Sequence, residues 1–230
     1  MELSLRLLKI ASMVEPCECL ADIGTDHAYI PIWLIKNEIC KRAVASDINE
    51  GPIKKAEKNI AEEGLTKKIE CRLGAGLNTI KPYEADTAVV AGMGGNLIRD
   101  IINNDIEVFK SLGCCIAQPV QNPEVFRQYI YNIGFTIIDE ELVFEDNKFY
   151  EIIKLKFEKV KEKVEPIYYE VGKKLLDKRH YLLKDFINYK LEKYNSINNK
   201  LIDNSVNSQI RKTEVINKIK DLKGLLDLCR

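Results

Sequence analysis

Residues 21–29 read Ala-Asp-Ile-Gly-Thr-Asp-His-Ala-Tyr, a sequence typical of the turn from a β-strand into a helix in nucleotide-binding proteins. A dinucleotide site has glycine at three spaced positions of this turn, so that backbone N–H groups can approach a pyrophosphate. Here only Gly24 is present, and Asp26 and Tyr29 take the other two positions. A carboxylate repels a diphosphate but attracts a cation. The turn therefore suits S-adenosylmethionine, with its sulfonium and ammonium groups, better than NAD or ATP.

The composition is that of a globular protein. The chain has 230 residues, of which 46% are hydrophobic, enough for one α/β domain with a smaller part attached. No apolar run approaches the roughly 20 residues that cross a bilayer, and the first residues do not resemble a secretion signal, so we expect a cytoplasmic protein without membrane contact. With two histidines and seven scattered cysteines, neither a disulfide framework nor a metal site is expected. The cysteines are Cys17, Cys19, Cys40, Cys71, Cys114, Cys115 and Cys229.

The net charge of zero conceals a difference between the two parts of the chain. Residues 1–150 contain 16 Lys and Arg against 23 Asp and Glu, which leaves 19 and 12 of the 35 of each kind for residues 151–230. The two parts therefore carry about −7 and +7. A basic surplus is what an appendage that contacts phosphates would show, although a solvated lysine-rich helix face is the commoner cause.

Strand-like and helix-like segments alternate after an opening amphipathic helix, and this alternation predicts an α/β fold. The apolar side of the opening helix carries Leu3, Leu7, Ile10, Ala11 and Val14. The expected strands are 19–23, 42–47, 69–73, 87–91 and 113–118. The expected helices between them are 30–37, 52–63, 97–103 and 123–133.

Two further β-like segments, 135–144 and 149–157, follow each other without a helix and are joined by a polar loop at 145–148. They predict an antiparallel pair at the edge of an otherwise parallel sheet, whose ligands bind at the carboxyl ends of the strands. The expected fold is therefore the Rossmann-like sheet of class I methyltransferases, mostly parallel with an antiparallel edge hairpin.

From about residue 159 the pattern becomes helical, so we expect one domain at 1–158 and a second at 159–230. Apolar residues recur at spacings of three and four on both sides of an interruption at 203–208. This pattern predicts a coiled-coil-like hairpin of two antiparallel helices. The apolar stripes are Leu175, Leu182, Phe186, Tyr189 and Ile197 before the interruption, and Val215, Ile219, Leu222 and Leu226 after it.

Two acids follow neighbouring strands at the positions that hold a nucleoside cofactor in this architecture. Asp22 ends the first strand just before Gly24, where an acid orients the methionine moiety of S-adenosylmethionine. Asp47, followed by Ile48 and Asn49, ends the second strand, where a carboxylate accepts hydrogen bonds from both ribose hydroxyls. Each acid alone is better explained as a helix cap or a turn residue, but their joint placement favours a cofactor site.

Two glycine-containing loops follow the third and fourth strands. Gly74, Ala75 and Gly76 stand where backbone groups face an adenine ring, and a simple loop is the alternative. Gly92 and Met93 begin the run Gly-Met-Gly-Gly after the fourth strand, where the methyl acceptor meets the cofactor in this architecture. The alternative explanation of these glycines is a turn that needs positive φ. Neither an Asn-Pro-Pro-Tyr motif nor a catalytic Pro-Cys pair is present, so exocyclic-amine and C5 methylation are disfavoured.

The remaining polar candidates have structural alternatives. Gln118 and Asn122 follow the fifth strand and could present amides to a base edge, but Asn122 before a proline is also a good helix N-cap. His27 is a candidate contact to the acceptor or a histidine satisfied by a backbone carbonyl. Tyr29 is a candidate stacking surface for a base or an ordinary packing residue.

Four segments together resemble the bacterial tRNA (adenine-22-N1)-methyltransferase family, TrmK. They are residues 21–31, residues 45–49, residues 90–95 and residues 118–123. The resemblance implies a class I methyltransferase with S-adenosylmethionine as donor, a tRNA adenine as acceptor and a helical tail that assists tRNA binding. Ala75 departs from the family, in which a polar residue is common. We further expect a monomer, with a dimer as the alternative.

No residue stands out as a catalytic base, and the chemistry explains why. Adenine N1 has an in-plane lone pair, so it can attack the methyl group without first losing a proton, and the ring becomes cationic on methylation. Catalysis therefore needs only a correctly positioned adenine ring and nearby carboxylates that stabilise its positive charge. Asp26 is the candidate for that electrostatic role. The expected acceptor-side residues are Asp26, His27, Tyr29, Gly92, Met93, Gln118 and Asn122. The expected cofactor-binding residues are Asp22, Gly24, Asp26, His27, Asp47, Ile48, Asn49, Gly74, Ala75, Gly76, Gly92 and Met93. The alternatives are methylation of another RNA and a non-catalytic Rossmann and coiled-coil interaction module.

Overall fold

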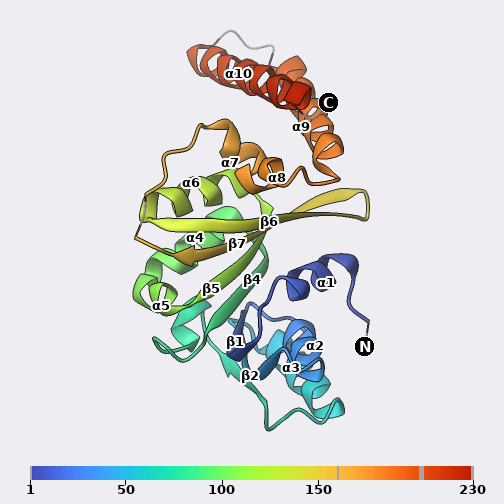
Figure 1. The fold of residues 1–230 in the computed structure, drawn as a ribbon, viewed down its shortest axis with the longest axis vertical. Helices are drawn as coiled ribbons and strands as arrows, with labels where there is room; N and C mark the ends of the chain where they lie inside the picture. Colours follow the sequence, from blue (N-terminus) through green and yellow to red (C-terminus); the bar gives the residue numbers. More distant parts are fainter. Residues whose placement is uncertain (1, 160, 202–204, 229–230) are drawn as a thin grey trace. The chain divides into compact units, whose positions relative to one another are not determined.

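The computed structural model describes residues 2–159, 161–201 and 205–228. The chain divides into two compact units, Met1–Val164 and Glu165–Arg230 (Figure 1). The sequence had placed a domain boundary after residue 158, near the end of the last strand. Cys229 and part of the expected interruption at 203–208 lie outside the described residues.

The first unit is built on a seven-stranded sheet in the order β3-β2-β1-β4-β5-β7-β6. The strands are β1 (Cys17–Ile23), β2 (Cys40–Asp47), β3 (Ile69–Leu73), β4 (Thr87–Gly94), β5 (Cys114–Gln121), β6 (Phe135–Glu145) and β7 (Lys148–Phe157). Strands β1 to β5 pair in parallel, and β7 pairs antiparallel with both β5 and β6. The mostly parallel sheet with an antiparallel edge is thus confirmed. The order reverses between β1 and β4, and such a switch point leaves a crevice at the carboxyl ends of the strands.

Helices cover both faces of this sheet (Figure 1). They are α1 (Leu5–Ser12), α2 (Tyr29–Lys36), α3 (Glu50–Glu62), the 3₁₀-helix η1 (Gly76–Thr79), α4 (Gly95–Asn104), α5 (Ile106–Ser111) and α6 (Pro123–Ile133). Helices α1 to α3 bury their apolar sides with β1 and β2 in one core, and α4 packs against α6. The side chain of Ser4 accepts a hydrogen bond from the backbone N–H of Leu7 and starts α1, so Leu3 and Val14 lie outside the helix that was expected to include them.

The hairpin turn and the end of β4 differ from the sequence expectation for local reasons. The hairpin turn contains only Asp146 and Asn147, both with positive φ, because a two-residue turn of this kind matches the twist of the paired strands. Strand β4 continues to Gly94, so the Gly-Met-Gly-Gly run is not a simple turn. Its register shifts around Met93, and Gly92 adopts a φ of +79°, which is the geometry of a β-bulge.

A buried ion cluster ties the hairpin to α6. Arg127 donates from Nε to Glu140 Oε1 and from Nη1 to Glu151 Oε2, both at 2.6 Å. All three side chains are buried. Charge-assisted bonds of this length offset the desolvation of the three groups only while all of them are present.

The described residues of the second unit form four helices, whereas the sequence predicted two. They are α7 (Ile167–Val171), α8 (Lys173–Asp177), α9 (Leu183–Lys200) and α10 (Val206–Leu228). Gly172, with a φ of +83°, separates α7 from α8, so Leu175 belongs to α8 and not to the long helix. Tyr189 is exposed, and Leu225 is buried in α10 where Leu226 was expected.

Polar groups also hold the second unit together. Helices α9 and α10 pack against each other. Glu170 of α7 accepts hydrogen bonds from Tyr194 of α9, at 2.6 Å, and from Lys218 of α10, at 2.5 Å. The pKa of Glu170 is lowered by Lys190, Lys218 and Tyr194, although burial opposes this change. The carboxylate therefore links three helices.

Candidate functional site

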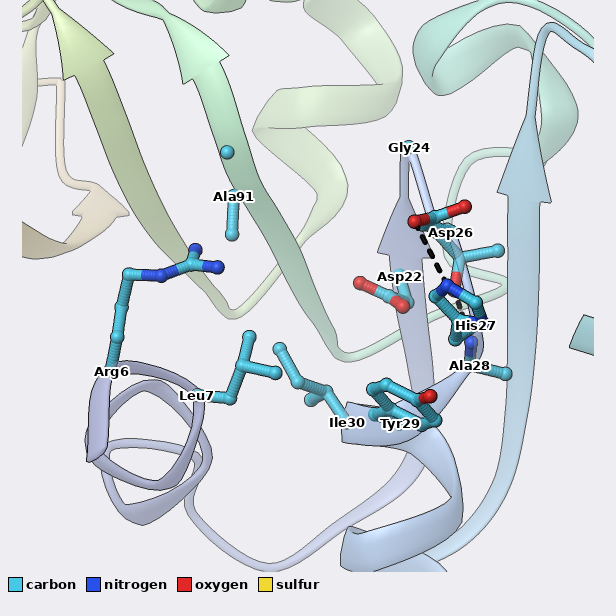
Figure 2. Close-up of a pocket in the computed structure, with 12 residues that line it drawn as sticks. Arg6, Leu7, Asp22, Gly24, Asp26, His27, Ala28, Tyr29, Ile30 and Ala91 are labelled. Carbon is cyan, nitrogen blue, oxygen red and sulfur yellow. Dashed lines mark hydrogen bonds and ion pairs between the residues drawn. The ribbon is translucent and has the colours of Figure 1, made fainter. Parts of the chain in front are cut away.

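A cavity of about 340 Å³ lies at the carboxyl ends of β1 and β4, at the switch point of the sheet (Figure 2). It brings together six residues that the sequence had singled out. They are Asp22, Gly24, Asp26, His27, Tyr29 and Gly92. The remaining lining residues are Arg6, Leu7, Thr25, Ala28, Ile30 and Ala91.

The turn from β1 into α2 is anchored by its own backbone. The N–H groups of Gly24 and Thr25 both donate to Ser46 O of β2, at 2.8 Å, and Thr25 Oγ1 accepts the N–H of Ala28 at 3.1 Å. Gly24 has a φ of +80°, and a Cβ there would lie 2.0 Å from Met93 Cε. Glycine is therefore favoured here for its backbone angle, whereas Met93 Cε is the end of a flexible side chain that can move aside.

Asp22 is the buried acid of the cavity. Burial raises the pKa of its carboxyl to about 6, repulsion from Asp47 adds to this effect, and a hydrogen bond from Thr25 opposes it. No ion-pair partner of Asp22 is found among residues 2–159, 161–201 and 205–228. A buried carboxylate without a cation is unfavourable, so the cavity presents a negative group that a positively charged ligand would stabilise.

Asp26 lies at the rim of the cavity and is exposed. Its carboxylate contacts Nε2 of His27 at 3.1 Å and Nζ of Lys55 at 3.2 Å. The rings of His27 and Tyr29 stack with centroids 4.8 Å apart and planes within 9°. Asp26 does not cap α2, because the N-cap position is Ala28 and no side chain caps that helix. The pair of stacked rings and the carboxylate form one polar edge of the opening (Figure 2).

Arg6 forms the opposite wall and was not anticipated from the sequence. Its Nη1 donates to Gln118 Oε1 at 2.8 Å, and its guanidinium lies 5.3 Å from the centre of the Tyr150 ring. Figure 2 shows Arg6 and Leu7 reaching from α1 across from the β1–α2 turn. The only local signal was an arginine on a short amphipathic helix, which ordinarily marks a solvated face.

The expected role of Gln118 needs correction, whereas Asn122 is exposed and its contact with the acceptor stays a prediction. Gln118 is fully buried and lies outside the cavity lining, so it does not present an amide to a base. Its Nε2 has no hydrogen-bond partner in the described part of the chain. Asn122 does occupy the N-cap position of α6, but with a φ of +50° and without a side-chain cap bond. A Cβ on Gly95 would lie 2.3 Å from Asn122 O. Because glycine has no Cβ, the first turn of α4 can lie against the backbone of Asn122.

The other cofactor candidates lie beside the cavity and not in its lining. Asp47 ends β2, next to β1, and its Oδ1 accepts the N–H of Asn49 at 2.7 Å. The N–H of Gly74 donates to Asp47 O at 2.9 Å, which joins the loops after β2 and β3. Ile48 is exposed, and Ala75 precedes η1, which begins at Gly76 with a φ of +59°.

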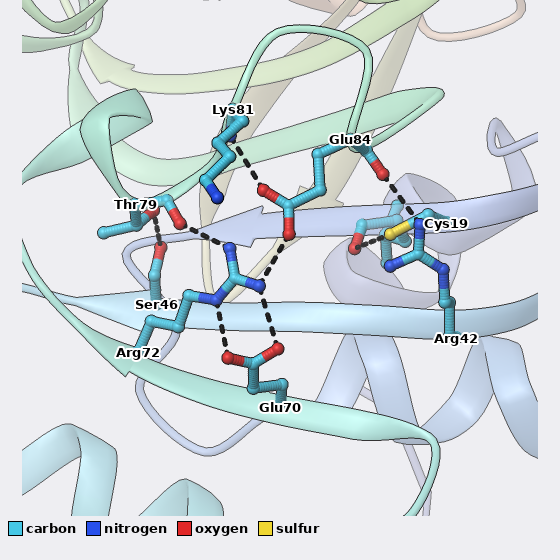
Figure 3. Close-up of polar contacts among 9 residues, drawn as sticks. Cys19, Arg42, Ser46, Glu70, Arg72, Thr79, Lys81 and Glu84 are labelled. Atoms are coloured by element: carbon cyan, nitrogen blue, oxygen red, sulfur yellow. Dashed lines mark hydrogen bonds and ion pairs between the residues drawn. The ribbon is translucent and has the colours of Figure 1, made fainter.

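A polar network supports the loop after β3 (Figure 3). Arg72 donates to both carboxylate oxygens of Glu70, to Glu84 Oε1 at 2.6 Å and to Thr79 O at 2.7 Å. Thr79 Oγ1 in turn bonds Ser46 Oγ at 3.0 Å. The Arg72 guanidinium lowers the pKa of Glu84 to about 2, so this carboxylate stays ionised and holds the loop at neutral pH. The loop that carries Gly74 is therefore fixed before any ligand binds.

In the ranges that the structure describes, no group of three or more His, Cys, Asp or Glu side chains is arranged to hold a metal ion. Of the described helices, none combines the length and the apolar character needed to cross a bilayer.

Comparisons with known proteins place this geometry in a family. A family model described as a methyltransferase domain matches residues 3–153. The tRNA (adenine(22)-N(1))-methyltransferase of Bacillus subtilis is 35% identical over 153 residues, 66% of this chain. The matched part spans 64% of that enzyme, slightly less than two thirds of its length.

Solved structures agree over nearly the whole chain. A protein from Listeria monocytogenes is 31% identical with a TM-score of 0.92, covering 98% of this chain and 100% of its own. TrmK of M. capricolum, solved with the cofactor product S-adenosyl-homocysteine, is 29% identical with a TM-score of 0.86, covering 100% of both chains. The chain belongs to the methyltransferase domain family and, within it, to the bacterial tRNA (adenine-22-N1)-methyltransferase family, TrmK.

Proposed function

We propose that this protein transfers a methyl group from S-adenosylmethionine to N1 of an adenine in tRNA, at position 22 as in the B. subtilis relative. The observation that carries the proposal is the buried carboxyl of Asp22, which opens into a cavity at the switch point of a methyltransferase sheet. A cytoplasmic monomer remains our prediction.

The residues of the site fit S-adenosylmethionine. The cavity contains a desolvated acid, Asp22, and a second carboxylate at its rim, Asp26, which together favour a cation. Asp47 lies at the end of the adjacent strand, where its carboxylate can receive a ribose diol. When bound, the cofactor supplies a methyl group on a positively charged sulfur. The chain's part is to hold that charge and to leave open space beside Gly92, where a Cβ would meet nothing within 4 Å.

The acceptor side fits a base that needs no deprotonation. Adenine N1 attacks through its lone pair, so the chain has to orient the ring and stabilise the positive charge that it gains. We assign the electrostatic part to Asp26, which is exposed at the opening. The stacked rings of His27 and Tyr29 offer a flat surface beside it for a base taken out of its stack.

The charge of the second unit supports a nucleic-acid substrate. Residues 165–230, which form this unit, contain 14 Lys and Arg and 9 Asp and Glu, a surplus of five positive charges. Such a surplus favours contacts with phosphates, and these contacts weaken as salt concentration rises. The predicted task of this unit is therefore to hold tRNA while the first unit positions the base.

The proposal is tested by incubating the full chain with an unmodified tRNA transcript and labelled S-adenosylmethionine, followed by nucleoside mass spectrometry. The expected product is 1-methyladenosine, and a transcript with guanine at position 22 should remain unlabelled. Label on another nucleoside would favour the alternative that a different RNA position is the substrate. Failure to bind S-adenosylmethionine would support a non-catalytic module.

Two variants separate the proposed roles. Asp26→Ala should lose methyl transfer while cofactor binding weakens only modestly, because its carboxylate is exposed at the acceptor side. Asp47→Ala should mainly raise the dissociation constant for the cofactor, measured by calorimetry, because the ribose would lose its acceptor. Unchanged turnover in the first variant, or unchanged affinity in the second, would overturn the respective assignment.

A further inference from the structure

Two free thiols meet at the amino ends of β1 and β2. Cys17 and Cys40 are register partners on these adjacent parallel strands, and their sulfur atoms lie 2.9 Å apart. Neighbouring strands are about 4.8 Å apart, which is within the Cα separation that a disulfide spans. The sulfurs need to approach by less than about 1 Å to reach a bond length of about 2.05 Å. The strands are therefore already placed for a link.

Only one of the two thiols faces an opening. Cys17 is half-buried and lines a cavity of about 560 Å³, whereas Cys40 is buried and absent from its lining. A reagent that enters the cavity therefore meets Cys17 first. Cys40 lies directly behind it at contact distance.

The two thiols also differ in acidity. The hydrogen bond between the Cys17 and Cys40 sulfur atoms lowers the pKa of Cys17, although burial and the nearby Asp86 oppose this effect. The same bond, together with burial, raises the pKa of Cys40. The thiolate is the reactive form of cysteine, so the accessible sulfur is the better nucleophile and the buried one follows.

The charge of the cavity limits the reagents that reach Cys17. The lining contains four carboxylates, from Glu15, Glu18, Glu38 and Asp86, and one ammonium, from Lys41. Lys41 is engaged with Glu18 at 2.5 Å, and Glu15 with Lys154 at 2.5 Å. An anionic oxidant such as oxidised glutathione is disfavoured by this excess of negative charge, whereas a neutral one is not.

We propose that Cys17 and Cys40 form a redox-active dithiol that is oxidised to a disulfide by small neutral hydroperoxides. Cys17 thiolate attacks one oxygen of the hydroperoxide, and the O–O bond breaks to give a Cys17 sulfenic acid and an alkoxide or hydroxide that takes up a proton. Cys40 sulfur then attacks Cys17 sulfur, and the S–O bond breaks with release of water. Overall, two thiols lose two electrons and two protons, and the hydroperoxide is reduced to water and an alcohol, or to two waters for hydrogen peroxide.

This site is separate from the proposed methyl-transfer site. The dithiol lies at the amino ends of β1 and β2, whereas Asp22 lies near the carboxyl end of β1. The strand between the two positions is buried in the core. The oxidation is therefore measured directly on the cysteines, and its outcome does not depend on the methyl acceptor.

The test uses the full chain, reduced, freed of reductant and treated with hydrogen peroxide near stoichiometric amounts. Remaining thiols are blocked with N-ethylmaleimide before tryptic digestion. The expected product is a disulfide between peptide 10–36 and peptide 37–41, reversed by dithiothreitol, with an intact mass lower by two hydrogens. Because peptide 10–36 also contains Cys19, the digest is repeated on Cys19→Ser, which should retain the link.

Further variants assign the two steps. Cys17→Ser and Cys40→Ser should both lose the link, and Cys40→Ser, or Cys40→Ala if serine impairs folding, should leave a Cys17 sulfenic acid that dimedone labels. Cys114→Ser, which removes another thiol of the same cavity, should retain the link. A link through Cys19 or Cys114, or oxidation of other cysteines without the 17–40 link, would overturn the proposal.

The effect of the acidic cavity lining is measured separately, with a cationic and an anionic disulfide. Cationic cystamine should consume the Cys17 thiol faster than anionic oxidised glutathione does at the same concentration, and the difference should shrink in high salt. Equal rates, or a faster reaction with glutathione, would show that the acidic lining does not select the oxidant.

Discussion

Replacing Asp22 with asparagine should raise the free energy of unfolding above pH 6, although it removes a group that the proposed reaction requires. The folded-state pKa of about 6 lies about two pH units above the ordinary value of 3.8. Each unit corresponds to about 1.4 kcal/mol, so the ionised carboxylate costs about 3 kcal/mol in the folded protein. Because the folded-state value is the higher one, folding takes up a proton between these pH values. The stability from this group is present below about pH 4 and is lost as the pH rises through about 6.

The measurement is urea unfolding of the wild type and of Asp22→Asn at pH 4.5, 6 and 8. The variant should gain about 2 kcal/mol relative to the wild type between pH 4.5 and pH 8, because about 1 kcal/mol of the total has already appeared at pH 4.5. Any constant packing effect of the amide cancels in this comparison. Asp26→Asn, on the exposed rim of the same cavity, is the matched control and should change by less than about 1 kcal/mol. A difference for Asp22→Asn that does not vary with pH would refute the reasoning.

Three further predictions follow from the same contacts. The dissociation constant for S-adenosylmethionine should rise about tenfold per pH unit well below pH 6, as Asp22 takes up its proton; a flat profile from pH 5 to 7 in calorimetry would contradict this. Arg127→Met removes the guanidinium that bonds two buried carboxylates and should cost about 3–5 kcal/mol in urea unfolding; a loss below about 1 kcal/mol would refute the cluster's role. Gly95→Ala places a methyl group against Asn122 O and should cost about 1–3 kcal/mol and reduce methyl transfer, whereas Gly51→Ala, where a Cβ meets nothing within 4 Å, should be neutral or better; equal effects of the two would show that the close approach is unimportant.

Local signals predicted those parts of the fold that depend on local chemistry. Helix α6 begins and ends as expected, because Pro123 suits a first turn and Gly134 adopts the left-handed angle that ends a helix. Strand β3 also has the expected bounds. The bulge at Gly92 was missed because glycine content predicts unusual φ angles but not whether strand pairing continues past them.

Contacts between distant parts of the sequence were not predictable in this way. The bond between Arg6 and Gln118 joins residues 112 positions apart, and nothing in either neighbourhood indicates it. Gln118 was therefore interpreted as an exposed amide when it is a buried acceptor. In the second unit, the break between α8 and α9 was overlooked because the apolar spacing from Leu175 to Phe186 continues across it. Spacing alone does not distinguish one helix from two consecutive ones.

The wall that α1 contributes has a consequence for the synthesis of the protein. Helix α1 is made first, but Arg6 bonds Gln118 and the N–H of Leu5 donates to Glu145 Oε1, 140 residues later. Until β5 and the hairpin have been translated, Arg6 and Leu5 lack these partners and the cavity lacks one wall. The site that holds the charge of Asp22 therefore closes late in translation, and a nascent chain halted before residue 118 should not yet bind the cofactor.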